Sequence, residues 1–200
     1  MQFDVQDWFT REAGAALGAA EMAAIISGNG TNKPNGFLNV APEAAADGSR
    51  TQGALKFITS GSAAAFSDSD RLIETEYDLQ AKHRTNARWV MNSSTVGQVR
   101  MMKDSAGRYL WNESLVPGQP PSLLGYPVLT CEGMPDVAAD DFPISFGDFA
   151  AAYVLADRGG LRTTVDDNIT QPGRVRWYVR KRVGGTVYDN DAVRLIKIAA

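Results

Sequence analysis

The stretch ISFGDFAAAYVLADRGGLRT, residues 144–163, predicts a strand, a tight turn and a second strand in close succession. Short apolar runs bounded by turn residues are typical of strands. Further along the chain, Val175, Trp177 and Val179 alternate with arginine and tyrosine side chains. A period of two is the pattern of a strand with one covered face and one exposed face. This region of the chain is therefore expected to be rich in β-structure.

The end of the chain predicts a long β-hairpin. Gly184 and Gly185 in the sequence RVGGTV favour a turn, and VRLIKIA, residues 193–199, favours a final strand. Together with the alternating segment, these features predict a hairpin from Arg174 to Ile198.

Upstream of residue 144 the pattern is mixed. Apolar residues at near-helical spacing and many alanines predict a helix over Phe3 to Ile26, ending at the glycines of GNG. A second helix is expected from Asp70, with Ser67 as its N-cap, and a third begins near Ser93. Short strands are expected after TNKPNG, at 55–58, at 88–92, at 108–111, and in LLGYPVLT, where a proline favours a sheet edge or bulge. The predicted fold class is α+β.

The composition of the chain excludes several classes of protein. Apolar residues make up 44% of the 200 residues and charged residues 22%, which is typical of a globular chain. Lysine and arginine total 20 against 23 acidic residues, a net charge of −3, so the surface as a whole is not built to hold nucleic acid. No apolar run approaches the roughly 18 residues that a membrane-spanning helix needs, so no membrane association is expected.

Candidates for catalysis and for metal or cofactor binding are few. The chain has one histidine, His83, and one cysteine, Cys131, which excludes two-histidine and multi-cysteine metal motifs. The glycine-rich GNGTNKPNG lacks the order of a P-loop, because proline follows Lys33. We therefore predict no catalytic residue, no metal site and no cofactor. The alternative is a small hydrolase that uses His83 with an acid or with Cys131.

One cluster of charge exceeds the background. Five of the 20 basic residues fall within nine positions: Arg174, Arg176, Arg180, Lys181 and Arg182. Three interpretations remain open. The side chains form a solvated face that protects a strand edge, contact an acidic patch on another protein chain, or bind nucleic acid. We predict these five residues as a candidate subunit contact.

Several phrases, in this order, resemble one family. They are ISGNGTNKPNGFLN (26–39), ARWVMNSSTVGQVRMMKDSAGRYLW (87–111), LLGYPV (123–128), MPD (134–136), ISFGDFAAAYVLADRGGLRT, and the closing KRVGGTVYDNDAVRLIKIA (181–199). The ordered set is similar to the C-terminal part of the major capsid proteins of tailed bacteriophages, of the Hong Kong 97 type. The resemblance covers nearly the whole chain.

The resemblance implies a Hong Kong 97-like fold with two lobes. Residues 37–158 would form the axial domain, whose copies meet around five-fold and six-fold axes. Residues 1–36, as the end of the family's spine helix, and 159–200, as the terminal hairpin, would form the peripheral domain that joins neighbouring capsomers.

The resemblance also implies a function and its partners. The protein would be a structural shell component of a phage or prophage virion, made in the bacterial cytoplasm, that assembles with itself around packaged DNA. Because nothing here matches the family's N-terminal arm and extended loop, we expect a truncated product or an engineered fragment. Alone, it is expected to be a monomer or small oligomer. An encapsulin-like nanocompartment shell, which would enclose cargo enzymes, is the alternative within the same fold.

Overall fold

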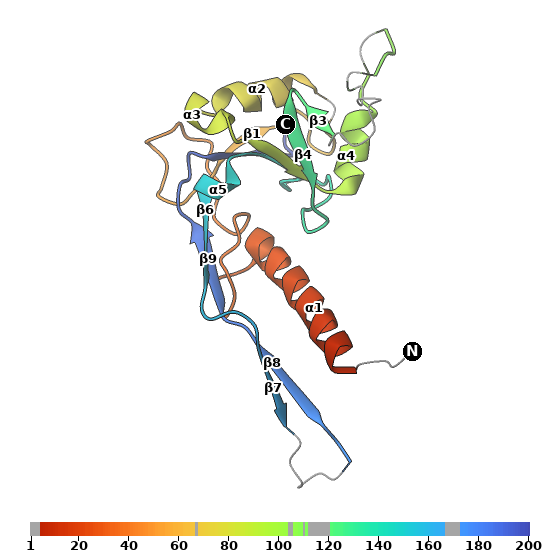
Figure 1. Cartoon of the computed structure of the whole chain (residues 1–200). Helices are drawn as coiled ribbons and strands as arrows, with labels where there is room; N and C mark the ends of the chain where they lie inside the picture. The colour runs from red at the N-terminus through yellow and green to blue at the C-terminus, as the bar shows by residue number, and fades with distance from the viewer. Residues whose placement is uncertain (1–4, 67, 104–105, 110, 112–120, 167–172) are drawn as a thin grey trace.

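The computed structural model describes residues 5–66, 68–103, 106–109, 111, 121–166 and 173–200. A body of sheet and short helices carries two long projections, the helix α1 and a two-stranded arm, which run in the same direction away from it (Figure 1). We define the arm as residues 153–166 and 176–187. In chain order the elements are α1 (Val5–Ser27), β1 (Lys56–Thr59), α2 (Asp70–Asp78), α3 (Ala81–Arg84), β2 (Arg88–Met91), α4 (Ser93–Arg100), β3 (Ser122–Leu123), β4 (Tyr126–Thr130), β5 (Ile144–Gly147), α5 (Phe149–Ala152), β6 (Tyr153–Asp157), β7 (Arg162–Asp166), β8 (Arg176–Arg180), β9 (Val183–Val187) and β10 (Val193–Lys197).

The body is built on a mixed sheet with the strand order β1-β10-β5-β2-β4-β3. The last strand, β10, pairs with β1 in parallel and with β5 in antiparallel orientation. Its residues Val193 to Ile196 are all buried, as expected for a strand covered on both faces. The expected terminal hairpin from Arg174 to Ile198 is therefore wrong, because this strand leaves the arm and completes the sheet of the body.

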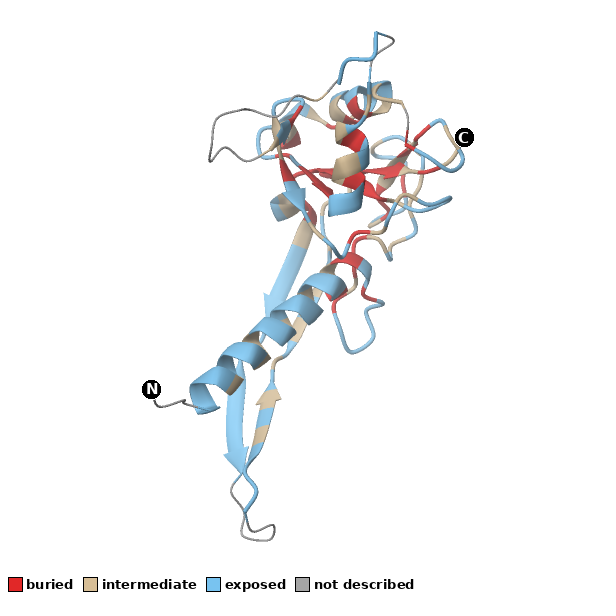
Figure 2. Ribbon diagram, turned by 90° about the vertical axis from the view of Figure 1, so that its right-hand side faces the viewer, coloured by how far each residue is buried: buried red, intermediate tan, exposed pale blue. Residues whose placement is uncertain are grey.

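Alternate residues of the sheet point into two buried clusters, one on each face. On one face Trp89 and Phe146 stack with ring centroids 4.3 Å apart, and α2 and α4 cover them with Leu72 and Val99. On the other face Val193 and Leu195 of β10 pack with the end of α1, through Ile26, and with α5. Nearly all buried residues lie in the body, whereas α1 and the arm are largely exposed (Figure 2).

Most locally predicted elements are confirmed. The first helix, the strands at 56–59 and 88–91, and the helix from Ser93 lie where they were expected. Asn92 caps this last helix, because its side-chain oxygen accepts a 2.7 Å hydrogen bond from the Thr95 N–H. The strand-turn-strand pattern of residues 144–157 is also confirmed, with α5 as the turn.

Other local predictions differ from the structure. Residues 37–39, expected as a strand, form a turn. The predicted cap Ser67 lies outside the described residues; the carboxylate of Asp68 accepts the Asp70 N–H instead. Of the strand expected at 108–111, the described residues show one bridge, between Lys103 and Tyr109. LLGYPVLT forms two strands, β3 and β4, rather than one, and its proline lies beside the short edge strand β3.

The arm has two successive ladders. β6 pairs with β9 close to the body, and β7 pairs with β8 further out. The expected turn at Gly184 and Gly185 is wrong, because both residues belong to β9. Gly185 meets a different requirement, since a Cβ atom there would lie 2.6 Å from the hydroxyl of Tyr153 on the neighbouring strand. The glycine permits close packing of the two strands rather than a turn.

A buried ion-pair network fastens β10 to the loop of residues 41–53 and to α2. The side chain of Arg194 is fully buried, and its guanidinium pairs with Asp47 at 2.7 Å and with Asp78 at 2.5 Å. Asp47 also accepts from Arg50, whose side chain is buried too. Burial raises the pKa of Asp47, but the hydrogen bond from Gln80, the charge of Arg194 and the hydrogen bonds from Arg50 and Arg194 more than offset this and lower the pKa below its ordinary value.

We predict that Arg194→Met lowers the free energy of unfolding by about 2–4 kcal/mol, because Asp47 and Asp78 lose their shared partner and keep only Arg50 and Lys56. Urea denaturation measures the change. The control is Lys197→Met on the same strand, whose partner Asp140 is 81% exposed; its cost should not exceed about 1 kcal/mol. Equal losses for the two variants would contradict the role assigned to the network.

Candidate functional site

The basic cluster predicted from the sequence lies on the arm. On β8, Trp177 and Val179 are half-buried, whereas Arg176 and Arg180 are exposed, so the alternation expected from the sequence is confirmed. Arg174, just before the strand, is exposed as well. The strand thus has an inner face toward α1 and an outer face that carries the arginines.

The inner face holds the arm against α1. The Trp177 ring packs on Phe9 of the helix with centroids 5.3 Å apart. Lys181 forms an ion pair with Glu21 of α1 at 2.7 Å and lies 3.6 Å from Asp157 on β6. The hydrogen bond with Glu21 raises the pKa of Lys181 above its ordinary value. Of the five predicted residues, Lys181 is therefore engaged within the chain.

Arg180 and Arg182 belong to a second group, whose other two arginines, Arg158 and Arg162, sequence reasoning missed. The register of the arm places Arg162 directly opposite Arg180, and the Arg158 N–H donates a 2.9 Å hydrogen bond to the Arg182 carbonyl. The ladders of the arm are interrupted at this point, where Gly159 and Gly160 take positive φ values of 88° and 61°. Two segments of the arm, residues 158–162 and 180–182, thereby bring four arginines together.

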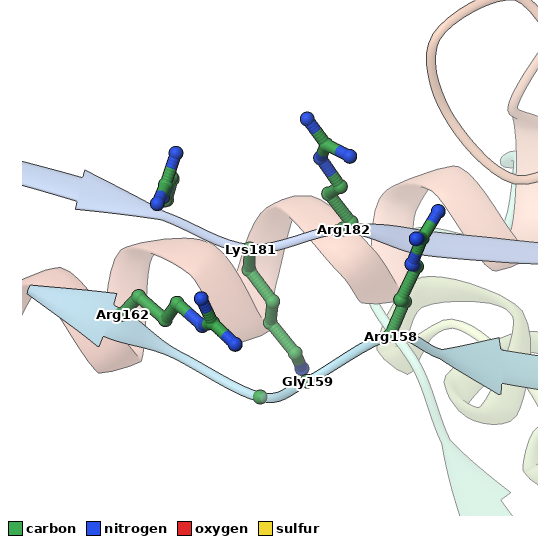
Figure 3. Close-up of a pocket in the computed structure, with 7 residues that line it drawn as sticks. Arg158, Gly159, Arg162, Lys181 and Arg182 are labelled. Carbon is green, nitrogen blue, oxygen red and sulfur yellow. The ribbon is translucent and has the colours of Figure 1, made fainter.

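These residues surround a hollow of about 270 Å³, which we call the arginine hollow. It is lined by Arg158, Gly159, Gly160, Arg162, Arg180, Lys181 and Arg182. Arg158 and Arg182 leave the two strands side by side and on the same side of the arm, while Arg162 reaches back over Gly159 (Figure 3). An added Cβ at Gly159 would lie 3.6 Å from the Arg162 Nη2, an ordinary contact, so the glycine is favoured here by its φ of 88° rather than by the guanidinium.

The sequence contained a partial signal for the missed residues. Arg158 and Arg162 flank a Gly-Gly pair, and glycines readily take the positive φ values that interrupt a strand. Their partners across the ladder follow only from the strand register. With 184–185 interpreted as a turn, that register could not be derived.

The residues weighed for catalysis do not come together. His83 is buried on α3, with its Nε2 3.5 Å from the Oδ2 of Asp189. Cys131 is half-buried beyond β4 and packs in the cluster on the other face of the sheet from the Trp89 stack. Within the ranges given above, no group of three His, Cys, Asp or Glu side chains is placed to hold a metal ion. Among the described helices, none combines the length and the hydrophobicity that a membrane span requires.

The family model described as "Phage capsid family" matches residues 1–198. The chain belongs to the phage capsid family. A search of curated proteins found no significant match.

Solved structures agree with this assignment. The chain is 43% identical to the capsid protein of an empty GTA particle, with a TM-score of 0.90, covering 100% of this chain and 68% of that one. The capsid of the native GTA particle matches at 43% identity and a TM-score of 0.89, covering 100% and 67%. An encapsulin complex from Synechococcus elongatus PCC 7942 matches at 12% identity and a TM-score of 0.60, covering 94% and 63%, which shows a shared fold alone.

The α+β fold of the Hong Kong 97 type and the assignment as a structural capsid protein, both expected from the sequence, are confirmed. The encapsulin alternative is not favoured, since that similarity is distant. The position of the arm and its arginines can therefore be considered as part of a shell subunit.

We predict that Gly185→Ala destabilises the protein by about 1–3 kcal/mol, because the new methyl group would overlap the Tyr153 ring. The matched control is Gly184→Ala, since a Cβ there meets nothing within 4 Å. Its unfolding free energy should stay within about 0.5 kcal/mol of the wild type. Thermal unfolding of the two variants makes the comparison; similar shifts would show that the contact with Tyr153 does not restrict residue 185.

Proposed function

We propose that this capsid protein assembles into closed icosahedral shells that enclose DNA. The observation that carries the proposal is the 43% identity, over the entire chain, to the capsid protein of a particle. Residues 37–152 together with β10 act as the axial domain around the five-fold and six-fold axes; the expected boundary at residue 158 moves because β6 belongs to the arm. The helix α1 and the arm act as the peripheral domain between capsomers, and the assembled protein is a component of the virion.

In this proposal the outer face of β8 is a subunit contact. Arg174, Arg176 and Arg180 are exposed on a projection that extends well beyond the body (Figure 2), where a neighbouring copy can be reached. Each copy has an excess of acidic residues, 23 against 20 basic ones, so its surface offers carboxylates to arginine. Arginine binds a carboxylate through two parallel hydrogen bonds, which fixes orientation as well as charge. Lys181 contributes indirectly by holding the arm on α1.

In the form of the protein that assembles, Arg176→Glu combined with Arg180→Glu is expected to block assembly while the subunit stays folded. Reversing two charges replaces attraction by repulsion at each copy of the contact, and a shell repeats the contact many times. Sedimentation and electron microscopy measure assembly, and circular dichroism checks the fold. The charge-preserving control, Arg176→Lys with Arg180→Lys, should still assemble.

Two results would contradict this contact. One is normal assembly of the double glutamate variant. The other is salt-sensitive DNA binding that the variant loses without any assembly defect. That result would show that the outer face of β8 binds DNA instead of a neighbouring subunit.

The 200-residue chain alone is expected to be a monomer or small oligomer that forms no closed shell. It spans 68% of the length of the capsid protein it resembles, so each pairwise interface should bury less area than in that particle. Stable interfaces need about 1,000 Å² or more of buried surface. Light scattering and negative-stain microscopy of the purified chain give the answer. Uniform spherical particles tens of nanometres across would refute the expectation.

A further inference from the structure

The arginines of the hollow differ from Arg50, Arg71 and Arg194 in having no acidic partner among the described residues. Arg50, Arg71 and Arg194 each form ion pairs with aspartate or glutamate side chains. Among the residues that the structure describes, no ion pair or side-chain hydrogen bond is found for the guanidinium groups that line the hollow. Those four groups belong to Arg158, Arg162, Arg180 and Arg182.

The acids near the hollow are already engaged. Glu21 pairs with Lys181, and Asp157 lies 3.6 Å from the same lysine. Asp157 also accepts the Gly160 N–H at 3.3 Å. The hollow therefore keeps a positive charge of about four after its lysine is compensated.

Such an arrangement has an energetic cost. Like charges directly opposite each other on paired strands are destabilising, and Arg162 faces Arg180 in this way. Arg158 and Arg182 repeat the juxtaposition where the outer ladder gives way to the inner one. An anion that binds between the strands would offset both repulsions. It would supply the negative charge that none of the described residues supplies.

We propose that the arginine hollow binds an oxyanion of the phosphate class. Guanidinium groups match phosphate oxygens with paired hydrogen bonds, and a phosphate carries more charge and more acceptor oxygens than one carboxylate. A hollow of about 270 Å³ is large enough to admit a phosphate group. The break in the ladder at Gly159 and Gly160 leaves the site open, because neither residue has a side chain to fill it.

The phosphate group can come from free inorganic phosphate or from the phosphodiester backbone of nucleic acid. Both present the same oxygens to the same arginines, so the test has one arm for each source. The proposal does not depend on shell assembly, because it is tested on the isolated 200-residue chain.

The first arm is calorimetric titration with inorganic phosphate at constant ionic strength. Arg158→Gln combined with Arg182→Gln should weaken phosphate binding about ten-fold or more, since two charge-assisted donors are removed. The matched control is Arg11→Gln with Arg88→Gln, which removes the same charge from exposed arginines of α1 and β2 and should bind like the wild type. A second variant, Arg158→Lys with Arg182→Lys, keeps the charge but loses the paired donors, so it should bind phosphate more weakly than the wild type. This variant tests the proposal if the glutamine variant does not fold.

The second arm is fluorescence anisotropy with a short DNA duplex and phosphate as competitor. DNA binding that the Arg158 and Arg182 variants lose and the control keeps would identify nucleic acid as a source of the phosphate. Phosphate binding without DNA binding would identify the free anion. Equal affinity of the hollow variants and the control for phosphate and DNA, or no binding of either probe by the wild type, would overturn the proposal.

Discussion

The position of β10 between β1 and β5 is the constraint on which the other features depend. The strand that completes the sheet is the last in the chain, so the sheet cannot close until residues 193–197 have returned from the arm. Buried apolar residues and the fully buried Arg194 then hold the strand, the latter through Asp47 and Asp78. Contacts between such distant parts of a chain make folding slow, because the loop must be ordered before the contacts form.

The arm is consequently a detour of the chain between two neighbouring strands of one sheet. It leaves directly after β5 and α5, and it returns directly into β10. Its base is fixed by the Tyr188 N–H, which donates to the Ala152 carbonyl at 2.8 Å. The loop after α1 adds a second attachment, because the Asn35 N–H donates to the Gly185 carbonyl and the Tyr153 hydroxyl donates to the Asn35 carbonyl. Aromatic packing of Trp177 on α1 supports the outer part.

The sequence was sufficient for features with a local cause. Helical spacing, the period of two in β8 and the buried run of β2 are properties of short segments, and all three are present in the structure. Which strands pair with each other, by contrast, is not a property of a short segment. The motif Gly184-Gly185 has the composition of a turn, yet its role is set by Tyr153 on another strand. For the same reason the five basic residues could be predicted as a group, whereas their division between α1, the outer face of β8 and the arginine hollow follows only from the register.

The direct connection between arm and sheet has a mechanical consequence. No flexible linker separates the body from β6, since α5 ends at Ala152 and the strand begins at Tyr153. On the return path, residues 188–192 alone lie between β9 and β10. A pull on the far end of the arm therefore reaches the six-stranded sheet along two covalent paths, one through α5 into β5 and one through residues 188–192 into β10. Force on the projection thus acts on two neighbouring strands that are buried in the body.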